Sequence, residues 1–230
     1  MSKYVLVPDS FKGTMTSREI CEIMQHAIER IDSDAKIISV PVADGGEGSV
    51  DAFLSALDGK RKAITVTGPH FEKLSSSYGI TDDGTAVIEM SACAGLPLVY
   101  GKKNPELTTT YGVGELICNA ARSGARRIVI GLGGSATNDG GCGAAAAAGI
   151  KFYDKSGKSF IPVGRTLKDI ASIDYSGLDS ALSGVSISAM CDVDNPLLGE
   201  TGAANVFGPQ KGANVAMIAR LDAGLKHLAE

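Results

Sequence analysis

A strand pattern and a helix pattern alternate twice along the first sixty residues. Short apolar runs predict strands at 4–7 and 36–42, and helical spacing of apolar residues predicts helices at 17–31 and 49–57. Strands that alternate with helices indicate a parallel sheet. Ligands bind such sheets at the carboxyl ends of the strands, where both polar loops of this segment fall. The pair Thr16 and Glu19 also has the spacing of a capping box, which predicts the start of the first helix.

The pattern changes after Gly59. Short strands at 63–67, 74–80 and 85–90 are separated by Gly-Pro and Asp-Asp-Gly turns, which is typical of antiparallel pairing. The remaining predicted elements are a helix at 112–122, a strand at 127–130, an alanine-rich helix at 144–149, strands at 151–154 and 185–190, and a helix at 215–228. The sequence therefore predicts an α/β protein with two parts and a boundary near residues 59–68.

Composition narrows the class of protein. The net charge of −4 and the pI of about 5.4 give no basic face for nucleic acid or an anionic membrane. No run of about 18 apolar residues predicts a membrane span, and the N-terminal residues lead into a strand rather than a signal peptide. The five cysteines are scattered and form no C-x-x-C pair. We expect a cytoplasmic protein with reduced thiols.

The loop at 8–13 combines an acid, a hydroxyl and a cation just before a predicted helix. The helix start offers free N–H groups and a partial positive charge to an anion. Lys12 adds a point charge that suits a carboxylate or a phosphate, beside Asp9 and Ser10. The alternative is an ordinary helix-entry loop with solvated polar residues.

The loop at 43–48 places Asp44 and Glu47 around three glycines, again between a strand and a helix. Its glycines indicate exposed backbone N–H groups, since a plain turn needs only one glycine. The two carboxylates could bind Mg²⁺, which prefers oxygen ligands, or orient substrate hydroxyls.

The segment 131–143 contains six glycines together with Ser135, Thr137 and Asn138. Glycines allow close approach and leave N–H donors unpaired, which a backbone phosphate cradle requires. The segment is not a Walker A motif, because G-x-x-x-x-G-K-[ST] occurs nowhere in the chain.

The same segment also fits the outline of a dinucleotide fingerprint. Gly131, Gly133 and Ala136 match G-x-G-x-x-A, and Asp154 ends the next predicted strand. A helix starting at this fingerprint would contain Gly140 and its glycine neighbour, at a cost of roughly 2 kcal/mol relative to alanines. This cost favours a long cradle, and an NAD(P)-dependent oxidoreductase stays open as the alternative.

Two later loops add acids and a cation. Asp192 and Asp194 suit Mg²⁺ binding or general-base chemistry, or an ordinary Asx turn, and Lys211 suits a phosphate or a Gly-Pro turn. The three histidines lie outside all five loops, which leaves little support for a Ser-His-Asp mechanism. Phosphoryl transfer uses the remaining parts, because it needs positioning, cations and a base.

Five segments occur in the order PDSFKG, ADGGEG, GGSATNDGG, CDVDNPL and FGPQKGA, and together they resemble the glycerate kinase family of bacteria. The resemblance implies transfer of the ATP γ-phosphate to a hydroxyl of D-glycerate, with Mg²⁺. It also implies two α/β domains, a flavodoxin-like parallel-sheet domain and a restriction-endonuclease-like mixed-sheet domain. In that family the flavodoxin-like domain is discontinuous, so we expect its N-terminal portion at 1–62 and the second domain, with the glycine-rich loop, at 63–230.

Family members continue past the position of Glu230, so we expect this chain to lack a C-terminal part. The outer strand edge of the first domain and the apolar face of 215–228 would then need covering by self-association or a complementing C-terminal segment. A non-catalytic truncated fragment is therefore a further alternative to an active kinase.

The resemblance and the residue chemistry together give a set of expected roles. The predicted substrate-binding residues are Asp9, Ser10, Lys12, Asp44 and Glu47. The residues predicted to bind ATP are Gly133, Gly134, Ser135, Ala136, Thr137, Asn138 and Asp139. The predicted catalytic residues are Asp192 as the base, Lys12 and Lys211, and the predicted Mg²⁺ ligands are Asp44, Asp192 and Asp194.

Overall fold

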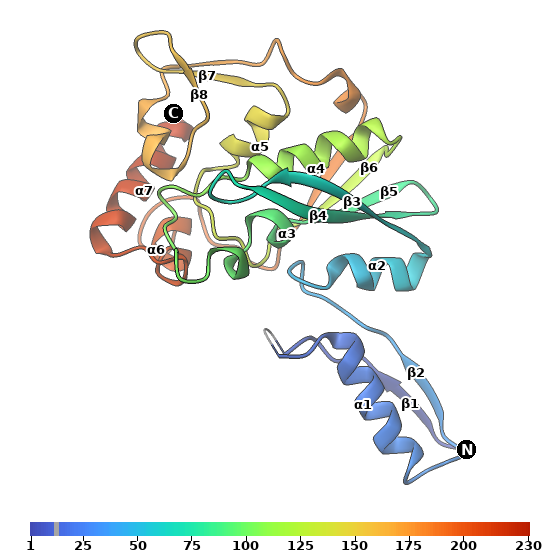
Figure 1. Cartoon of the computed structure of the whole chain (residues 1–230). Helices are drawn as coiled ribbons and strands as arrows, with labels where there is room; N and C mark the ends of the chain where they lie inside the picture. Colours follow the sequence, from blue (N-terminus) through green and yellow to red (C-terminus); the bar gives the residue numbers. More distant parts are fainter. Residues whose placement is uncertain (12–13) are drawn as a thin grey trace.

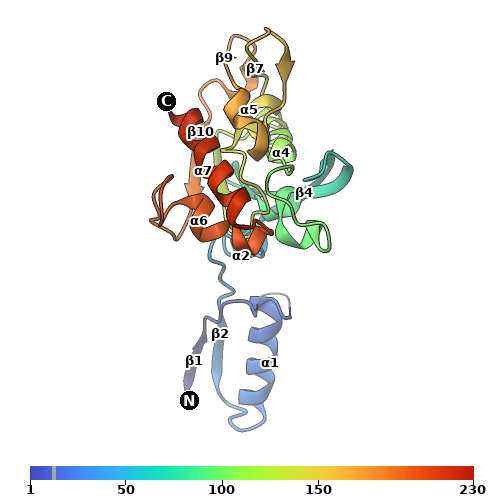
Figure 2. The same cartoon turned by 90° about the vertical axis from the view of Figure 1, so that its left-hand side faces the viewer.

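The computed structural model of the chain describes residues 1–11 and 14–230 (Figure 1). A small N-terminal unit lies apart from a larger body, and an extended segment around residues 40–48 joins them (Figures 1 and 2). The structure is mixed α/β, as the alternating pattern predicts.

The N-terminal unit contains two parallel strands and one helix. Strands β1 (Lys3–Leu6) and β2 (Lys36–Ser39) pair in parallel, and helix α1 (Ser17–Glu29) packs beside them (Figure 2). The capping box is confirmed: Thr16 Oγ1 accepts from the N–H of Glu19 at 3.2 Å, and Glu19 Oε2 accepts from the N–H of Thr16 at 2.7 Å. The parallel pair and the helix start are thus where the sequence predicts them.

This unit has little core of its own. Leu6, Ile20 and Cys21 are buried, but Val5 and Val7 are each more than half exposed on the strand side. The apolar surface of the strands therefore remains open in this chain. Cover from self-association or from another segment stays a prediction.

The larger body is built on a mixed five-stranded sheet. Its order is β10–β6–β5–β4–β3, with β3–β4–β5 antiparallel, as the turns predict, and β5–β6–β10 parallel. The strands are β3 (Gly59–Thr67), β4 (Lys73–Thr81), β5 (Thr85–Glu89), β6 (Arg127–Gly131) and β10 (Ser186–Met190). Helix α4 (Tyr111–Arg122) covers one face and α2 (Ser49–Leu57) the other (Figure 1). Apolar residues of strands and helix, Ile88, Leu116 and Ile128 among them, form its core.

Helix α2 packs on the large sheet rather than on the N-terminal unit. Val50 and Leu54 lie against Gly79 of β4, and Glu89 Oε1 of β5 accepts a hydrogen bond from the N–H of Val50 at 2.8 Å. The division at residues 62 and 63 stays a prediction. The packing of α2 favours a division before this helix instead.

A second core joins the C-terminal helices to a small antiparallel sheet. Leu221 and Leu225 of α7 (Val215–Ala229) are buried, together with Leu167 of the 3₁₀ helix η2 (Gly164–Asp169). The expectation that the apolar face of 215–228 lacks cover is therefore wrong. Its cover comes from short elements without a periodic pattern, which the sequence does not reveal. Beside η2 these are β7 (Lys151–Tyr153), β8 (Ser159–Phe160), β9 (Ser172–Asp174), α5 (Cys142–Ala147) and α6 (Ala203–Phe207).

Four further short elements complete the described part of the chain: α3 (Ser91–Ala94), η1 (Leu96–Val99), η3 (Ser180–Leu182) and η4 (Pro209–Lys211). Within the described ranges, none of the helices combines the length and apolar character that crossing a membrane requires.

Candidate functional site

Three of the predicted loops meet at one edge of the five-stranded sheet. The parallel strands β5, β6 and β10 end there side by side, so that Glu89, Gly131 and Met190 lie in register. The N–H of Met90 donates to Gly131 O at 2.9 Å, and the N–H of Leu132 donates to Met190 O at 3.2 Å. The carboxyl edge of the sheet is therefore where the glycine-rich loop and the acidic loop at 191–197 begin, as expected for a ligand site.

The loop at 43–48 reaches the same edge and touches the glycine-rich loop, backbone against backbone. The N–H of Gly133 donates to Gly45 O at 3.1 Å. A Cβ on Gly131 would lie 2.2 Å from Gly45 O, and one on Gly133 would lie 2.8 Å from Gly46 Cα. Glycine is required at 131 and 133 because the backbones of two loops approach each other there, not because a ligand approaches. The sequence predicts the need for close approach but not its partner.

The middle of the glycine-rich loop keeps unused donors. The N–H of Ala136 donates to Ala94 O at 2.8 Å, which ties the loop to α3. Within residues 1–11 and 14–230, the neighbouring N–H groups have no acceptor; they are those of Gly134, Ser135, Thr137 and Asn138. A fixed loop with several unpaired N–H groups is the arrangement that a bound anion satisfies. The structure thus supports the phosphate-cradle interpretation of this loop.

Asp139 turns its carboxylate into the protein. Its Oδ2 accepts from the N–H and the hydroxyl of Thr110, both at 2.8 Å, and from the N–H of Gly143 at 3.2 Å. Burial raises the pKa of Asp139, and these donors oppose the shift. The carboxylate therefore holds the loop in shape and does not face a ligand directly.

Lys211 lies buried beneath the same loop, only 8% exposed. Its Nζ donates to Thr137 O at 2.6 Å and to Ser135 Oγ at 3.0 Å. Burial lowers the pKa of Lys211 to about 8, and the charge of Asp139 partly opposes this shift. The structure brings together the loop and the lysine that the sequence assigns to phosphate, although 68 residues separate Gly143 from Lys211.

A groove of about 290 Å³ runs along this loop. One wall is the loop itself, from Ser135 to Gly141, and Lys211 lies at its base. The opposite wall is apolar. It is formed by Leu197 of the acidic loop, Ala203 and Phe207 of α6, and Leu225 of α7.

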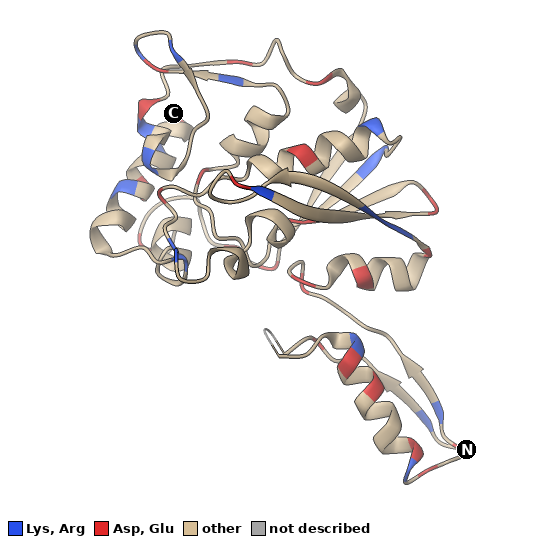
Figure 3. Cartoon of the chain, viewed as in Figure 1, with Lys and Arg blue, Asp and Glu red and all other residues tan. Residues whose placement is uncertain are grey.

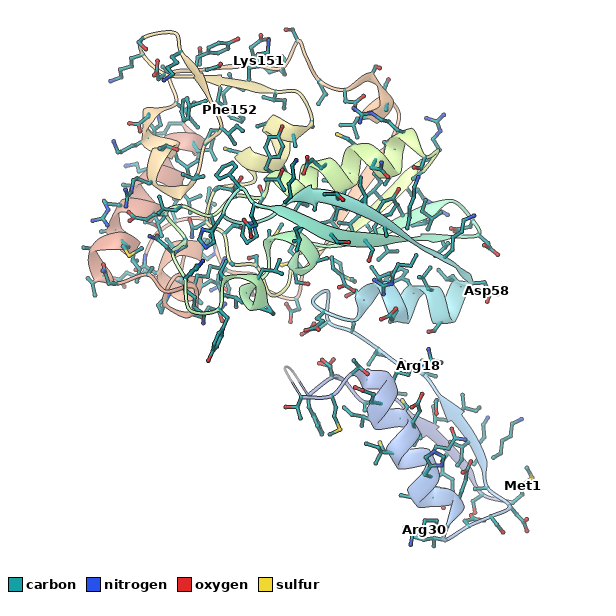
Figure 4. All side chains as sticks on the ribbon, in the orientation of Figure 1. Met1, Arg18, Arg30, Asp58, Lys151 and Phe152 are labelled. Atoms are coloured by element: carbon teal, nitrogen blue, oxygen red, sulfur yellow. The ribbon has the colours of Figure 1, made fainter. Side chains whose placement is uncertain are left out.

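A second cleft, of about 400 Å³, lies between the start of α1 and α2. Ser10 and Glu47, both predicted to bind substrate, line it. Arg18, at the end of α1 nearest α2, also lines it (Figure 4). Acidic residues of both helices line it, namely Glu19 of α1 and Asp51 of α2. Figure 3 shows acidic positions, in red, on both helices.

The start of α1 is a weaker anion site than the sequence suggests. The carboxylate of Glu19 accepts the N–H of Thr16 and places a negative charge in the first turn, where an anion would otherwise bind. Asp9 accepts from the N–H of Ser10 at 2.7 Å, and Asp44 from the N–H of Gly46 at 3.1 Å. Lys12 lies outside the described residues.

Asp192 and Asp194 are exposed on the extended segment that follows β10, and neither lines the groove or the cleft. Among the described residues, no three His, Cys, Asp or Glu side chains lie close enough to hold a metal ion together. The assignment of Asp44, Asp192 and Asp194 as Mg²⁺ ligands stays a prediction.

The dinucleotide fingerprint is wrong on this geometry. Helix α5 begins only at Cys142, far past Gly133, where a Rossmann helix would start. Asp154 follows β7, which lies in the small sheet and not beside β6. Its carboxylate accepts from the N–H groups of Ser156 and Lys158 in its own turn. The local spacing matches, but the neighbouring strand does not.

Two buried acids escape sequence reasoning. Glu89 anchors α2, and Glu106 accepts from Arg220 Nε at 2.7 Å and also pairs with Arg165. Glu106 is 2% exposed and connects the loop before α4 to η2 and α7. A single acid in a segment without periodicity has no local signal. Its partners lie 59 and 114 residues further along the chain.

Comparison with known proteins agrees with this arrangement. The chain is 48% identical over 230 residues to the glycerate 2-kinase of Escherichia coli K12 and 47% identical to the glycerate kinase of Bacillus subtilis 168. Each alignment covers 99% of this chain and 60% of the relative. A crystal structure from Salmonella typhimurium LT2, assigned as glycerate kinase 2, superimposes with a TM-score of 0.86 at 44% identity. That match covers 99% of this chain and 62% of the other.

The chain thus spans about 60% of the length of these relatives. The family model for the glycerate kinase family matches residues 4–230, which include all five predicted loops. The chain belongs to the glycerate kinase family.

Proposed function

We propose that this chain acts in the phosphorylation of D-glycerate, with ATP as the phosphate donor and phosphoglycerate and ADP as products. The observation that carries the proposal is the buried ammonium of Lys211 beneath a glycine-rich loop with unpaired N–H groups. A fixed cation and fixed donors stabilise the charge that develops on a transferring phosphoryl group. The chain spans only part of its relatives, so the activity of the whole enzyme belongs to the proposal as well.

The triphosphate would bind at residues 133–139. Its oxygens would accept from the N–H groups of the loop, and the hydroxyls of Ser135 and Thr137 are small enough to allow this approach. Lys211 would neutralise charge from below the loop. Its bonds to Ser135 and Thr137 hold the ammonium in place before a ligand arrives.

Glycerate would bind between the loops at 8–13 and 43–48, within reach of the cleft that Ser10 and Glu47 line. Carboxylates accept hydrogen bonds from hydroxyl groups, so Asp44 and Glu47 would orient the two hydroxyls of glycerate. Lys12 and the neighbouring Asp9 would complete the substrate site. Asp192 would take the proton of the attacking hydroxyl, with Asp194 as a weaker candidate.

Mg²⁺ belongs to this proposal as the ion that shields the phosphate charge, with Asp44, Asp192 and Asp194 as its predicted ligands. The roles proposed for Lys211, the loop N–H groups and Asp192 do not depend on that ion. A reaction that consumes ATP also fits the expected cytoplasmic location.

A coupled assay of ADP release with D-glycerate, ATP and Mg²⁺ tests this function. We expect glycerate-dependent ADP release that Lys211→Met lowers at least a hundredfold, because a buried charge-assisted contact is lost. Lys168→Met is the matched control, since Lys168 is exposed and, among the described residues, forms an ion pair with Asp169 alone. ADP release without dependence on glycerate, or equal rates in the two variants, would contradict the proposal.

Titration with ATP and with NADH separates the alternatives. The kinase requires ATP binding that Lys211→Met weakens, whereas an oxidoreductase would bind NADH in preference. ATP binding by a folded chain without turnover would identify a non-catalytic fragment.

A further inference from the structure

Asn138 contains a buried polar atom that nothing in the described chain satisfies. The residue is 7% exposed, and its Oδ1 has no hydrogen-bond partner among the described residues. An unpaired buried acceptor costs about 1–3 kcal/mol, so buried polar atoms are normally met by protein, water or a ligand. Asn138 lines the groove of about 290 Å³ beside Lys211. Oδ1 itself is enclosed, so a turn of the side chain would present this unused acceptor, and the donor beside it on the same amide, to a molecule in that groove.

The remaining walls of the groove are apolar. Leu132, Leu197 and Leu225 line it together with Ala203 and the aromatic ring of Phe207. A small polyhydroxy acid gains nothing from such walls, because its surface is polar. A flat heteroaromatic base buries two apolar faces and presents its polar atoms only at the edge. The groove is also close to the lower limit of about 300 Å³ for small-molecule pockets, which suits a nucleoside but not a whole nucleotide.

The groove and the phosphate cradle are continuous. Ser135 and Thr137, which contact Lys211, also line the groove. A nucleoside in the groove would therefore direct its 5′-phosphates along the loop towards the unpaired N–H groups. One ligand would then satisfy the amide, the apolar walls and the cradle together.

We propose that this groove binds the nucleoside of the phosphate donor, and that the amide of Asn138 recognises the edge of an adenine base. The inference rests on the proposed function, in which a nucleoside triphosphate supplies the phosphate. An asparagine amide matches adenine because it donates to a ring nitrogen while it accepts from the exocyclic amino group. Guanine presents a carbonyl acceptor in place of that amino group, so the same pair of bonds cannot form. The side chain of Asn138 thus determines specificity for the base, while its backbone N–H belongs to the phosphate cradle.

Calorimetric titrations of the chain with ATP, GTP, adenosine and inorganic triphosphate test the assignment. In Asn138→Ala we expect ATP to bind about tenfold more weakly and the preference for ATP over GTP to disappear. Binding of inorganic triphosphate should stay within about twofold of the original, because no phosphate contact changes. In Lys211→Met, ATP and inorganic triphosphate should both bind more weakly.

A second variant probes the apolar wall without touching a polar group. Leu197→Ala removes part of the wall and should weaken adenosine and ATP by about threefold to tenfold, with triphosphate unchanged. Val193→Ala is the matched control, because Val193 is an exposed apolar residue of the same segment that lines neither cavity. Circular dichroism spectra of all variants confirm that they are folded.

The outcomes separate this inference from the proposed function. Equal weakening of ATP and inorganic triphosphate in Asn138→Ala would place the amide at the phosphates and overturn the inference. If ATP bound no more tightly than inorganic triphosphate, the inference would be overturned as well, while the phosphate site would stand. Base discrimination through Asn138 without glycerate-dependent ADP release would support the inference and contradict the kinase. Failure to bind either ATP or triphosphate would contradict both.

Discussion

The N-terminal unit and the larger body carry predicted loops at the same kind of position, yet they hold those loops in different ways. In the larger body, Asp139 and Lys211 are buried and fix the glycine-rich loop from within. In the N-terminal unit, a buried hydroxyl ties the described part of the loop after β1 to the segment after β2. Ser17 Oγ donates to Pro8 O at 2.6 Å and accepts from the N–H of Val42 at 3.0 Å.

The difference shows how core size limits a site. A sheet covered on both faces can bury a lysine and an aspartate beneath a loop, because surrounding side chains supply their partners. Two strands and one helix cannot do so, and their loops depend on surface contacts. We therefore expect the phosphate part of the site to be rigid and the loops of the N-terminal unit to be the adaptable part.

The largest effect should come from removing the buried carboxylate of the larger body. Asp139→Ala leaves four donors of Thr110, Gly141 and Gly143 without their acceptor and removes a negative charge that acts on Lys211. We expect the free energy of unfolding to fall by about 3–5 kcal/mol, because several buried donors lose their acceptor at once. Urea unfolding followed by circular dichroism measures this change.

Asp154→Ala is the control for that variant. Its carboxylate also accepts several hydrogen bonds, but at an exposed turn. The loss should stay below about 1 kcal/mol. Similar losses in the two variants would show that burial does not distinguish the two sites.

The next largest effect concerns pH. The pKa of Lys211 is lowered to about 8 in the folded chain, from an ordinary value of 10.5. Below about pH 8, Lys211 is protonated in both the folded and the unfolded chain, so the full cost of burying its charge lowers the stability of the folded chain. Between pH 8 and 10.5 the unfolded chain binds more protons, so stability rises with pH, by up to about 3 kcal/mol.

Urea unfolding at several pH values between 7 and 10.5 tests this prediction against Lys211→Met, which lacks the titrating group. The difference in stability between the two proteins should change with pH in that window. A constant difference would mean that the ammonium is solvated and the larger body less closed. Affinity for inorganic triphosphate should fall over the same range, because neutral Lys211 no longer attracts the anion.

A smaller effect should arise where the linker to the N-terminal unit meets the body. A Cβ at Gly131 would lie 2.2 Å from Gly45 O, and both partners are backbone atoms. Gly131→Ala should cost about 1–3 kcal/mol as overpacking and should speed hydrogen exchange of the amides at 43–48. Gly157→Ala faces open space at a φ of +79° and should cost about 1–2 kcal/mol without changing exchange at 43–48. Unchanged exchange in Gly131→Ala would show that the two loops do not support each other.

The smallest effects compare two helix caps in which a side-chain oxygen accepts a hydrogen bond from a backbone N–H of the first turn. Thr16 caps α1, and Asn214 caps α7 through its Oδ1 and the N–H of Met217 at 2.9 Å. Alanine at either position should cost about 1 kcal/mol. We expect Asn214→Ala to lower the midpoint of global unfolding, and Thr16→Ala to speed hydrogen exchange only within α1. A global effect of Thr16→Ala would mean that the two regions unfold together.

Local patterns predicted local structure well. The two opening strand–helix units, the antiparallel strands, the capping box at Thr16 and the final helix are confirmed, because each depends on neighbours within a few residues. The unpaired N–H groups of the glycine-rich loop agree with the cradle interpretation, which also depends on neighbouring residues. The composition of that loop already excludes a regular helix or strand.

Relations between distant segments could not be predicted in this way. The pattern at 49–57 indicates a helix, but it does not indicate which sheet the helix packs against. That depends on its contacts with Glu89 and Gly79, which lie in the five-stranded sheet. The fingerprint around Gly133 fails because it implies a neighbouring strand that the fold does not provide. The inward turn of Asp139 depends on Thr110, 29 residues earlier in the chain. The roles predicted for Asp192, Asp194 and Lys12 remain predictions.

The contact between Gly45–Gly46 and Gly131–Gly133 has a consequence for protein engineering. A Cβ at Gly131 would lie 2.2 Å from Gly45 O, and one at Gly133 would lie 2.8 Å from Gly46 Cα, so single substitutions at these two positions fail for the same steric reason. Such changes become tolerable only if the loop at 43–48 moves as well, which couples variation at 131 and 133 to that loop. A library aimed at a new phosphate donor or a new acceptor would therefore keep this contact constant. It would place its diversity at side chains that line the two cavities, such as Asn138, Leu197 and Glu47.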